Sequence, residues 1–316
     1  MQRKFRFGTS IQPTSRPELL SQVHRAEDLG YSSITVTDHI SSPRLAPFAT
    51  LAAMAALDSR LRLLSTVFGN DFRHPAFLAS EAATIDLISE GRLELGIGTG
   101  WLESDYEQTG IPFDPPGTRV NRLIEAVQLI KALFTDDSVA FAGEYYTVRN
   151  LKLWPKPVQR PHPPLLIGGG GKRMLTLAAR EADIVSVNPV TAGGTMDFQT
   201  YRAEVFAQKI EWVRAAAGER FADLEVHSML FGVIVTDNQQ EAAQDWINQV
   251  EKMFDRPINL SIEDVLASPY IVIGTASQIA EKLEMCRELY GVSYFTTASM
   301  INMEHLSPTV GQLAGK

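Results

Sequence analysis

Apolar and polar positions along the first hundred residues alternate between two periods. Short apolar or β-branched runs, typical of buried strands, are separated by segments in which apolar residues recur at helical spacing, as at Leu19, Val23 and Ala26. The runs begin about 30 residues apart, which is the length of one strand–helix–strand unit. These predicted strands cover residues 5–9, 32–37, 61–67 and 92–97.

The rest of the chain continues this alternation with one interruption. Four more strands are predicted at residues 165–167, 183–187, 224–235 and 292–297. Helices are predicted over residues 118–134, 172–182, 197–217, 240–250 and 275–290. The interruption at 139–164 contains a predicted hairpin and a proline-rich return. With 188–196 and 253–273, it is a candidate insertion over the catalytic face.

Eight strands that alternate with helices predict an α/β fold with a parallel sheet. Eight units favour closure into a (β/α)8 TIM barrel, with the insertions over its C-terminal face. An open, doubly wound sheet remains an alternative, because alternation alone does not fix closure. No linker or low-complexity tract interrupts the pattern, so residues 1–316 are expected to form a single domain.

Composition narrows the possible partners and compartment. A net charge of −8 disfavours binding to nucleic acid or to an anionic membrane, although a local basic pocket remains possible. Cys286 is the only cysteine, which excludes an intrachain disulfide framework and is typical of a reducing compartment. The first residues lack the apolar segment of a signal peptide, and no apolar run approaches the roughly 20 residues of a membrane helix. We therefore expect a cytoplasmic protein.

The second predicted strand ends in Thr37, Asp38 and His39. A carboxylate beside an imidazole at the carboxyl end of a barrel strand is a candidate acid/base pair, because histidine titrates near neutrality. The alternative is a solvated loop in which the aspartate caps a helix. No two histidines have the spacing of metal ligands, so no metal site is expected.

The fourth predicted strand ends in LELGIGTGW, which contains Gly96, Gly98 and Gly100. A similar glycine motif opens Rossmann-type methyltransferases, but there it follows the first strand of the sheet. Here three strand–helix units come first. We interpret the glycines as allowing close approach to a flat ligand, with Thr99 offering a hydroxyl; a tight turn without a ligand is the alternative.

The fifth predicted strand ends in LLIGGGGKRM, directly before a helix. Exposed backbone N–H groups, the positive end of the helix dipole and a lysine together favour a phosphate site. The spacing is not that of a P-loop. A structural turn is the alternative, although four consecutive glycines are entropically costly for a turn. The residues of this predicted site are Gly168, Gly169, Gly170, Gly171 and Lys172.

Several of these motifs occur together in one family. The chain resembles the bacterial luciferase-like superfamily and, within it, the coenzyme F420-dependent oxidoreductases. The resemblance covers nearly the whole chain. It is carried by TDH at 37–39, by the long block at 65–101, and by GEYYTV, PKPVQRPHPPLLIGGGGKR and IGTASQIAEKL.

The resemblance implies a barrel that binds a deazaflavin at the carboxyl ends of its strands. His39 corresponds to the catalytic histidine and Asp38 to a neighbouring cofactor contact, which is also expected to help hold His39. A non-proline cis peptide that backs the ring is expected near Ser65–Thr66, to within one residue. Gly168–Gly171 and Lys172 would hold the phosphate, while Thr99, Gly100 and Trp101 would line the ring.

Three positions depart from relatives of known substrate, and all three are expected in the substrate pocket. Pro43 lies near the place where the sugar-phosphate and secondary-alcohol dehydrogenases of the family carry a tryptophan. Trp101 and Gln12 replace acidic residues of the glucose-6-phosphate dehydrogenases. The pocket is thus expected to be less acidic, and neither substrate is implied.

The sequence therefore favours hydride transfer between C5 of F420 and a small organic substrate, with His39 as acid/base. An FMN-dependent monooxygenase is the alternative within the same fold. A non-enzymatic cofactor carrier and a methyltransferase are less favoured. A homodimer is expected because members of the family it resembles often dimerise through barrel helices.

Overall fold

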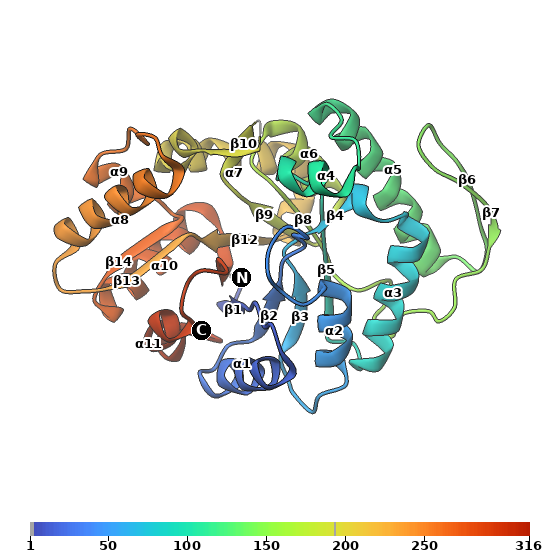
Figure 1. Ribbon diagram of the computed structural model, residues 1–316, viewed down its shortest axis with the longest axis horizontal. Helices are drawn as coiled ribbons and strands as arrows, with labels where there is room; N and C mark the ends of the chain where they lie inside the picture. Colours follow the sequence, from blue (N-terminus) through green and yellow to red (C-terminus); the bar gives the residue numbers. More distant parts are fainter. Residues whose placement is uncertain (1–2, 193) are drawn as a thin grey trace.

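The computed structural model describes residues 3–192 and 194–316. Its centre is a closed barrel of eight parallel strands, in the order β3-β2-β1-β15-β12-β9-β8-β5, and pairing of β3 with β5 closes the ring (Figure 1). The short strand β4 (Phe68–Gly69) adds to β5. The predicted TIM barrel is confirmed, and each barrel strand overlaps a predicted one. The barrel strands are β1 (Arg6–Ser10), β2 (Ser33–Val36), β3 (Arg62–Ser65), β5 (Leu93–Gly98), β8 (Leu165–Gly169), β9 (Ile184–Val187), β12 (Glu225–Leu230) and β15 (Val292–Thr297).

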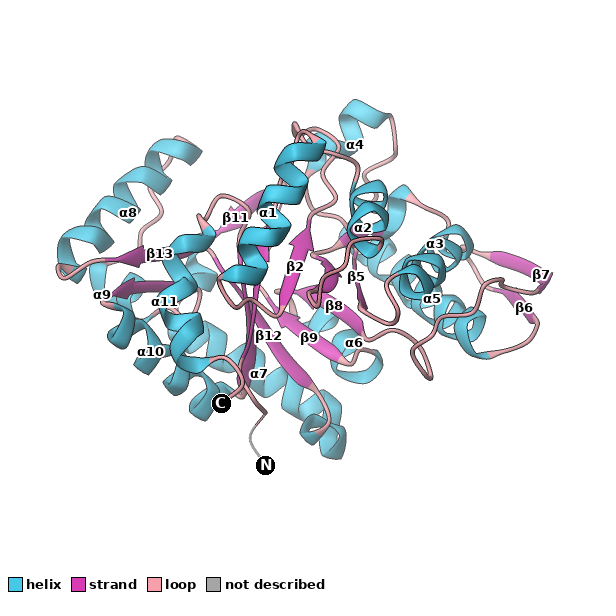
Figure 2. Ribbon diagram, turned by 90° about the horizontal axis from the view of Figure 1, so that it is seen from below, coloured by secondary structure: helices cyan, strands magenta, loops and turns pink. Residues whose placement is uncertain are grey.

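Helices surround the barrel because each buries one apolar face against the strands (Figure 2). The capping box that begins α10, formed by Thr275 and Gln278, shows how local sequence fixes these helix starts. Backbone hydrogen bonds between Phe5 and the last two residues bring the two ends of the chain together. The principal helices are α1 (Arg16–Asp28), α2 (Pro47–Ala55), α3 (Pro75–Ile88), α5 (Pro116–Thr135), α6 (Lys172–Glu181), α7 (Ala203–Ala217), α10 (Ala276–Tyr290) and α11 (Met303–Leu313). Among the described residues, no helix is both long and apolar enough to cross a membrane.

The three predicted insertions carry structure of their own. The first holds the predicted hairpin, β6 (Val139–Ala142) and β7 (Thr147–Leu151), which projects away from the barrel (Figure 1). The second holds the hairpin of β10 (Val190–Ala192) and β11 (Thr195–Asp197), followed by η2 (Phe198–Tyr201). The third holds α9 (Ile262–Ala267) and β14 (Ile271–Gly274). A short helix, α4 (Glu103–Thr109), follows the glycine motif of β5.

The single strand predicted over residues 224–235 is wrong. It is two strands, and the chain leaves the barrel at Phe231, whose N–H donates to the Tyr270 carbonyl at 2.7 Å. Beyond that point β13 (Gly232–Val235) pairs with β14 in a separate two-stranded sheet beside α8 (Gln239–Phe254). Both halves are apolar, so the hydrophobic pattern alone could not reveal the change of sheet.

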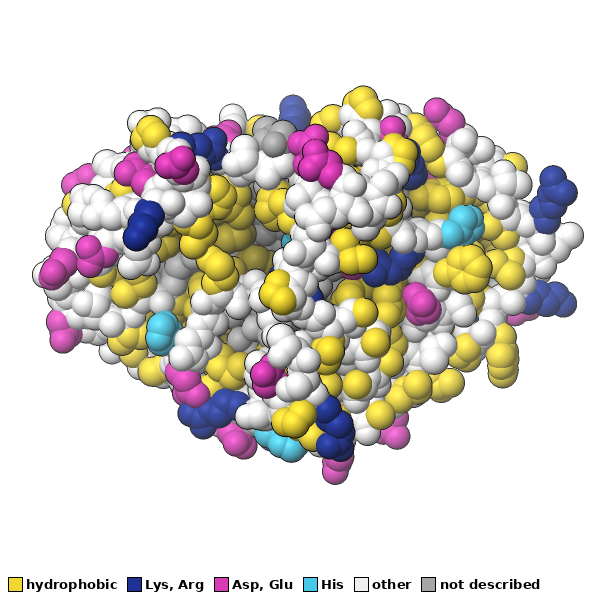
Figure 3. Space-filling model, viewed as in Figure 1, with side chains coloured by type: hydrophobic (Ala, Val, Ile, Leu, Met, Phe, Trp, Pro, Cys, Tyr) yellow, Lys and Arg dark blue, Asp and Glu magenta, His cyan; other side chains and the backbone are white. Residues whose placement is uncertain are grey.

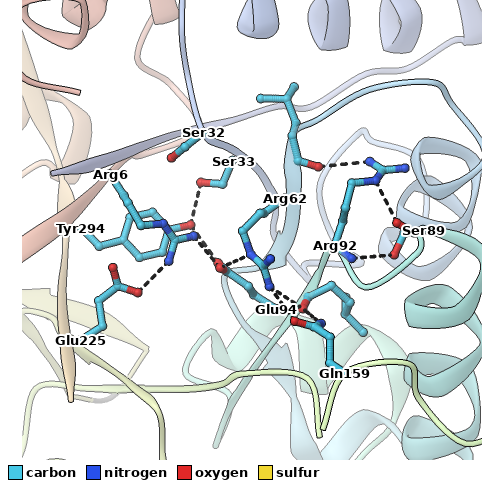
Figure 4. A network of polar contacts seen from close by, with 12 residues as sticks. Arg6, Ser32, Ser33, Arg62, Ser89, Arg92, Glu94, Gln159, Glu225 and Tyr294 are labelled. Carbon is cyan, nitrogen blue, oxygen red and sulfur yellow. Dashed lines mark hydrogen bonds and ion pairs between the residues drawn. The ribbon is translucent and has the colours of Figure 1, made fainter. Parts of the chain in front are cut away.

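The amino-terminal end of the barrel is closed by a network of charges (Figure 4). Glu94, with a side chain only 1% exposed, accepts hydrogen bonds from Arg6 and Arg62. Its second oxygen lies 3.1 Å from the Tyr294 hydroxyl, and Arg6 also reaches Glu225 at 2.6 Å. Every one of these charges has an opposite charge within reach, so the network is suited to stabilising this end of the barrel.

Candidate active site

A cavity of about 1300 Å³ occupies the opposite, carboxyl-terminal end of the barrel. Its wall is made by the loops that follow the strands, which is where TIM barrels carry their active sites. The structure therefore brings the TDH motif, the glycine loop after β5 and the glycine turn after β8 to one space. The predicted site residues that line it are Asp38, His39, Thr66, Thr99, Gly100, Trp101, Gly168, Gly169, Gly170, Gly171 and Lys172.

Three predicted site residues, Gln12, Pro43 and Ser65, are not among the described residues that line this cavity, and their contact with cofactor or substrate stays a prediction. Gln12 is partly exposed and Pro43 is exposed. The Ser65 hydroxyl is buried, where it accepts from the Gly96 N–H and donates to the Gly96 carbonyl, both at 2.9 Å. Ser65 thus ties β3 to β5.

The partner of His39 is Asp105, a residue that the sequence analysis did not single out. Nδ1 of His39 lies 2.7 Å from Oδ2 of Asp105, which sits in the first turn of α4. Ser41 donates to the other oxygen from its N–H at 3.0 Å and its hydroxyl at 2.6 Å. Burial alone would raise the pKa of Asp105, but the hydrogen bonds from Ser41 and His39 outweigh it and lower that pKa. Since Nδ1 faces the carboxylate, Nε2 is the ring nitrogen left for a ligand.

Asp38 does not hold His39, contrary to expectation. Its carboxylate forms a bidentate ion pair with Arg73, with 2.9 Å between Oδ1 and Nη2, and accepts the Gly69 N–H at 3.0 Å. The Arg73 guanidinium in turn lies over the rings of Phe48 and Phe68. Asp38 therefore fixes the loop after β3, and its oxygens are already satisfied.

A non-proline cis peptide joins Thr66 and Val67, within one residue of the expected Ser65–Thr66, and both residues line the cavity. A Cβ added to Gly98 would lie 2.6 Å from the Val67 side chain, and one added to Gly96 would overlap the Ser65 carbonyl. These two glycines thus make room for the end of β3, in addition to any ligand. The buried Thr66 hydroxyl has no hydrogen-bond partner among the described residues.

Hydrogen bonds from Tyr106 and Arg119 fix the loop after β5 in place. Gly100 has a φ of 74°, and a Cβ there would overlap the Tyr106 hydroxyl. That hydroxyl donates to the Thr99 carbonyl at 3.0 Å, while Arg119 donates to the carbonyl of Gly100. Trp101 leaves this loop edge-on to the His39 ring, with centroids 5.6 Å apart. The loop therefore presents a fixed surface beside His39.

The glycine turn after β8 combines packing with an open helix start. A Cβ added to Gly169 would lie 2.5 Å from the Met174 side chain, and one added to Gly170 would lie 2.5 Å from the Pro189 carbonyl. Packing alone therefore requires glycine at these two positions. Gly171 has open space before it, and no side chain of the described residues caps α6. The first N–H groups of α6 and the ammonium of Lys172 are thus available to an anion.

Lys209 is a second residue that the sequence analysis missed. It lies on the buried face of α7, where its Nζ donates to the Asn188 carbonyl at 2.7 Å and lies 3.2 Å from the Tyr270 hydroxyl. Burial lowers the pKa of Lys209 to about 7. Its helical spacing with Phe206, Ile210 and Val213 placed it on that face, which was the available signal. Because Asn188 lines the cavity, Lys209 supports its wall.

The donors in the wall fit a phosphorylated, planar ring compound. The helix start at Gly171 suits the phosphate, while Thr66 and the Thr99–Gly100 backbone offer polar groups to a ring. Within residues 3–192 and 194–316, no three metal-ligating side chains gather in a way that could hold a metal ion.

Known proteins are similar to this chain in sequence and in fold. The sequence model of the luciferase-like monooxygenases matches residues 4–293. An F420-dependent glucose-6-phosphate dehydrogenase of Amycolatopsis mediterranei is 32% identical over 187 residues, 57% of this chain and 56% of that protein. An FMNH2-dependent dimethylsulfone monooxygenase of Pseudomonas putida is 26% identical over 190 residues, 60% and 49% of the two chains. The chain spans about half the length of the curated relatives it matches.

A solved structure extends the likeness over the whole fold. The coenzyme F420-dependent tetrahydromethanopterin reductase of Methanopyrus kandleri superposes with a TM-score of 0.77 over 99% of both chains, at 19% identity. At that identity the likeness shows the fold alone.

Proposed function

The chain belongs to the luciferase-like monooxygenase family, and on that premise we propose that it is an F420-dependent oxidoreductase acting on a small organic substrate. The observation that carries the proposal is the meeting of two features in one cavity: the open start of α6 and the imidazole of His39, oriented by Asp105. When bound, the deazaflavin would supply or accept the hydride at its C5.

The residues of the chain would bind and orient the reactants. Lys172 and the backbone N–H groups of the glycine turn would hold the phosphate. The Thr99–Trp101 loop and the Thr66–Val67 segment would face the ring. The His39 Nε2 would hold or release the proton that accompanies hydride transfer, while Asp105 keeps Nδ1 protonated and stabilises the imidazolium.

FMN is the second candidate cofactor, because the same helix start and flat surface suit its phosphate and ring. The similarity to a dimethylsulfone monooxygenase keeps an FMN-dependent monooxygenase as the alternative function. TDH followed by GTGW resembles the F420 branch, and for that reason we favour F420.

Titration of the purified protein with F420 and with FMN, followed by fluorescence quenching, tests the choice. We expect F420 to bind far more tightly. His39→Ala should keep the affinity for F420 but lose turnover in a screen of alcohols, alkenes and imines, because it removes only the proton-transfer group. His24→Ala, on the exposed face of α1, is the matched control. Undiminished turnover by His39→Ala would refute the catalytic assignment, and tighter binding of FMN would favour the monooxygenase.

A further inference from the structure

The cavity has two chemically different walls. Residues 37–173 supply every charged side chain, apart from histidine, among the described residues that line it. These are Asp38, Asp105, Asp114, Arg119, Lys172 and Arg173. The wall built from residues 229–301 contains no Asp, Glu, Lys or Arg among its described residues.

We term this second side the apolar wall. It comes from the end of β12, from β13, from one face of α8 and from the loop after β15, and it is partly open to solvent. Met253 is 58% exposed and Met300 is 75% exposed. Gln249, Asn302 and His305 also line the cavity on this side and add polar groups. The apolar wall consists of Met229, Phe231, Val233, Ile234, Trp246, Val250, Met253, Phe254, Met300 and Ile301.

The space-filling view shows where this wall is accessible. Between the part of the molecule that carries α8 and β13 and the barrel, the surface is hollowed, and hydrophobic side chains line the hollow (Figure 3). A contiguous exposed apolar surface of this kind is typical of ligand grooves in soluble proteins. The volume of about 1300 Å³ also exceeds the roughly 300–1,000 Å³ of single-ligand clefts. The cavity therefore has room for a second molecule beside a cofactor.

Aromatic side chains that pack on one another hold the apolar wall in place. The Tyr201 ring packs against Phe231, Trp246 and Tyr270, with centroids 5.4–6.2 Å apart. Trp246 lies so close to Gly232 that an added Cβ would be 2.9 Å from its ring nitrogen. Such aromatic packing fixes side chains in one arrangement. The wall is therefore a preformed surface.

We propose that the apolar wall binds the hydrocarbon part of an uncharged substrate, a chain or ring whose reactive carbon lies towards His39. This assignment rests on the proposed function, since it places the substrate beside the redox cofactor. A phosphate or carboxylate at this wall would lose hydration without meeting a Lys or Arg side chain among the described residues of the wall, which is costly. An alkyl group at this wall binds more tightly with every methylene that it removes from water.

Binding of a homologous alcohol series tests the wall without any cofactor. Isothermal titration of the whole protein with the straight-chain alcohols from 1-butanol to 1-decanol should show affinity rising roughly three- to fourfold for each added methylene, until the groove is filled. Equal affinity along the series would overturn the assignment.

A matched pair of substitutions on α8 locates the binding. Met253→Asp puts a carboxylate into the apolar wall, while Gln244→Asp puts the same charge at an exposed position of α8 outside the cavity lining. We expect Met253→Asp to bind 1-octanol at least about tenfold more weakly than Gln244→Asp. Met300→Asp, from the loop after β15, should act like Met253→Asp. Equal affinity of all three variants would contradict the proposal.

The two proposals fail separately. If alcohols bind with the predicted series and the Met253→Asp loss, but neither F420 nor FMN binds, the apolar wall stands and the proposed function falls. If F420 binds and turnover requires His39, but the alcohol series is flat, the proposed function stands and the substrate assignment falls.

Discussion

The two ends of the barrel treat buried cations in opposite ways. At the amino-terminal end, burial would lower the pKa of Arg6, but Glu94, Tyr294 and Glu225 outweigh it and raise that pKa. Near the carboxyl-terminal end, Lys209 is fully buried, but the oxygens within hydrogen-bond distance of its Nζ are uncharged, and its pKa falls to about 7. The ion pairs of the amino-terminal end keep Arg6 charged, whereas Lys209, near the end that faces the cavity, can change its protonation near neutral pH.

The largest effect is expected where the closed end is broken. Glu94→Gln removes the charge that two arginines share, and should lower the free energy of unfolding by about 3–5 kcal/mol. Urea unfolding measures this. Glu144→Gln, on the exposed hairpin, is the control. A loss below about 1 kcal/mol would show that the network contributes little to the fold.

The next effect concerns the open end. Asp105→Asn should lower turnover roughly 100-fold with little change in unfolding free energy, since the amide no longer holds His39 in the right tautomer. Because this is a positioning role, the pH–rate profile should change while the affinity for F420 stays the same. Asp105→Glu should restore part of the turnover. A loss of stability large enough to explain the lost turnover would contradict this role.

The third prediction is that Lys209 makes the stability of the protein depend on pH. Its pKa in the folded state, about 7, lies below its ordinary value of 10.5, so the unfolded chain binds more protons between these values. Its contribution to stability therefore rises with pH in this window, by up to about 1.4 kcal/mol per unit, and is lost as pH falls through 7. Lys209→Met should remove that slope from urea unfolding between pH 7 and 10, whereas Lys152→Met, at an exposed site, should keep it. If Lys209→Met and Lys152→Met showed the same slope, the lowered pKa assigned to Lys209 would be wrong.

The smallest effect tests the helix start. Lys172 is exposed, so its charge is screened. Lys172→Met should weaken F420 binding only about two- to fivefold, and the difference should shrink at high salt. Fluorescence titration at two ionic strengths measures it, with Lys152→Met as the control. An unchanged affinity at low salt would remove Lys172 from the phosphate site.

The sequence predicted the barrel because its buried parallel strands are continuous apolar runs. It also predicted that His39 and the glycine turn would meet, because strand-end loops share one face. The Asp105 contact could not be predicted, since it depends on how α4 folds back over His39. The hydrogen bonds of Ser65 to Gly96 could not be predicted either, since they join two neighbouring strands that lie thirty-one residues apart along the chain. The break at Phe231 depends on pairing with Tyr270, thirty-nine residues away along the chain.

That break at Phe231 separates two tasks within one polypeptide. The ring of strands carries the fold, while α8 and the β13–β14 pair stand outside it, and α8 and β13 form much of the apolar wall. If the apolar wall binds substrate as proposed, exchanging side chains along residues 246–254 should alter selectivity with little disturbance of the ring. Variation in this one helix offers evolution, or an engineer, a direct route to new specificities on an unchanged scaffold.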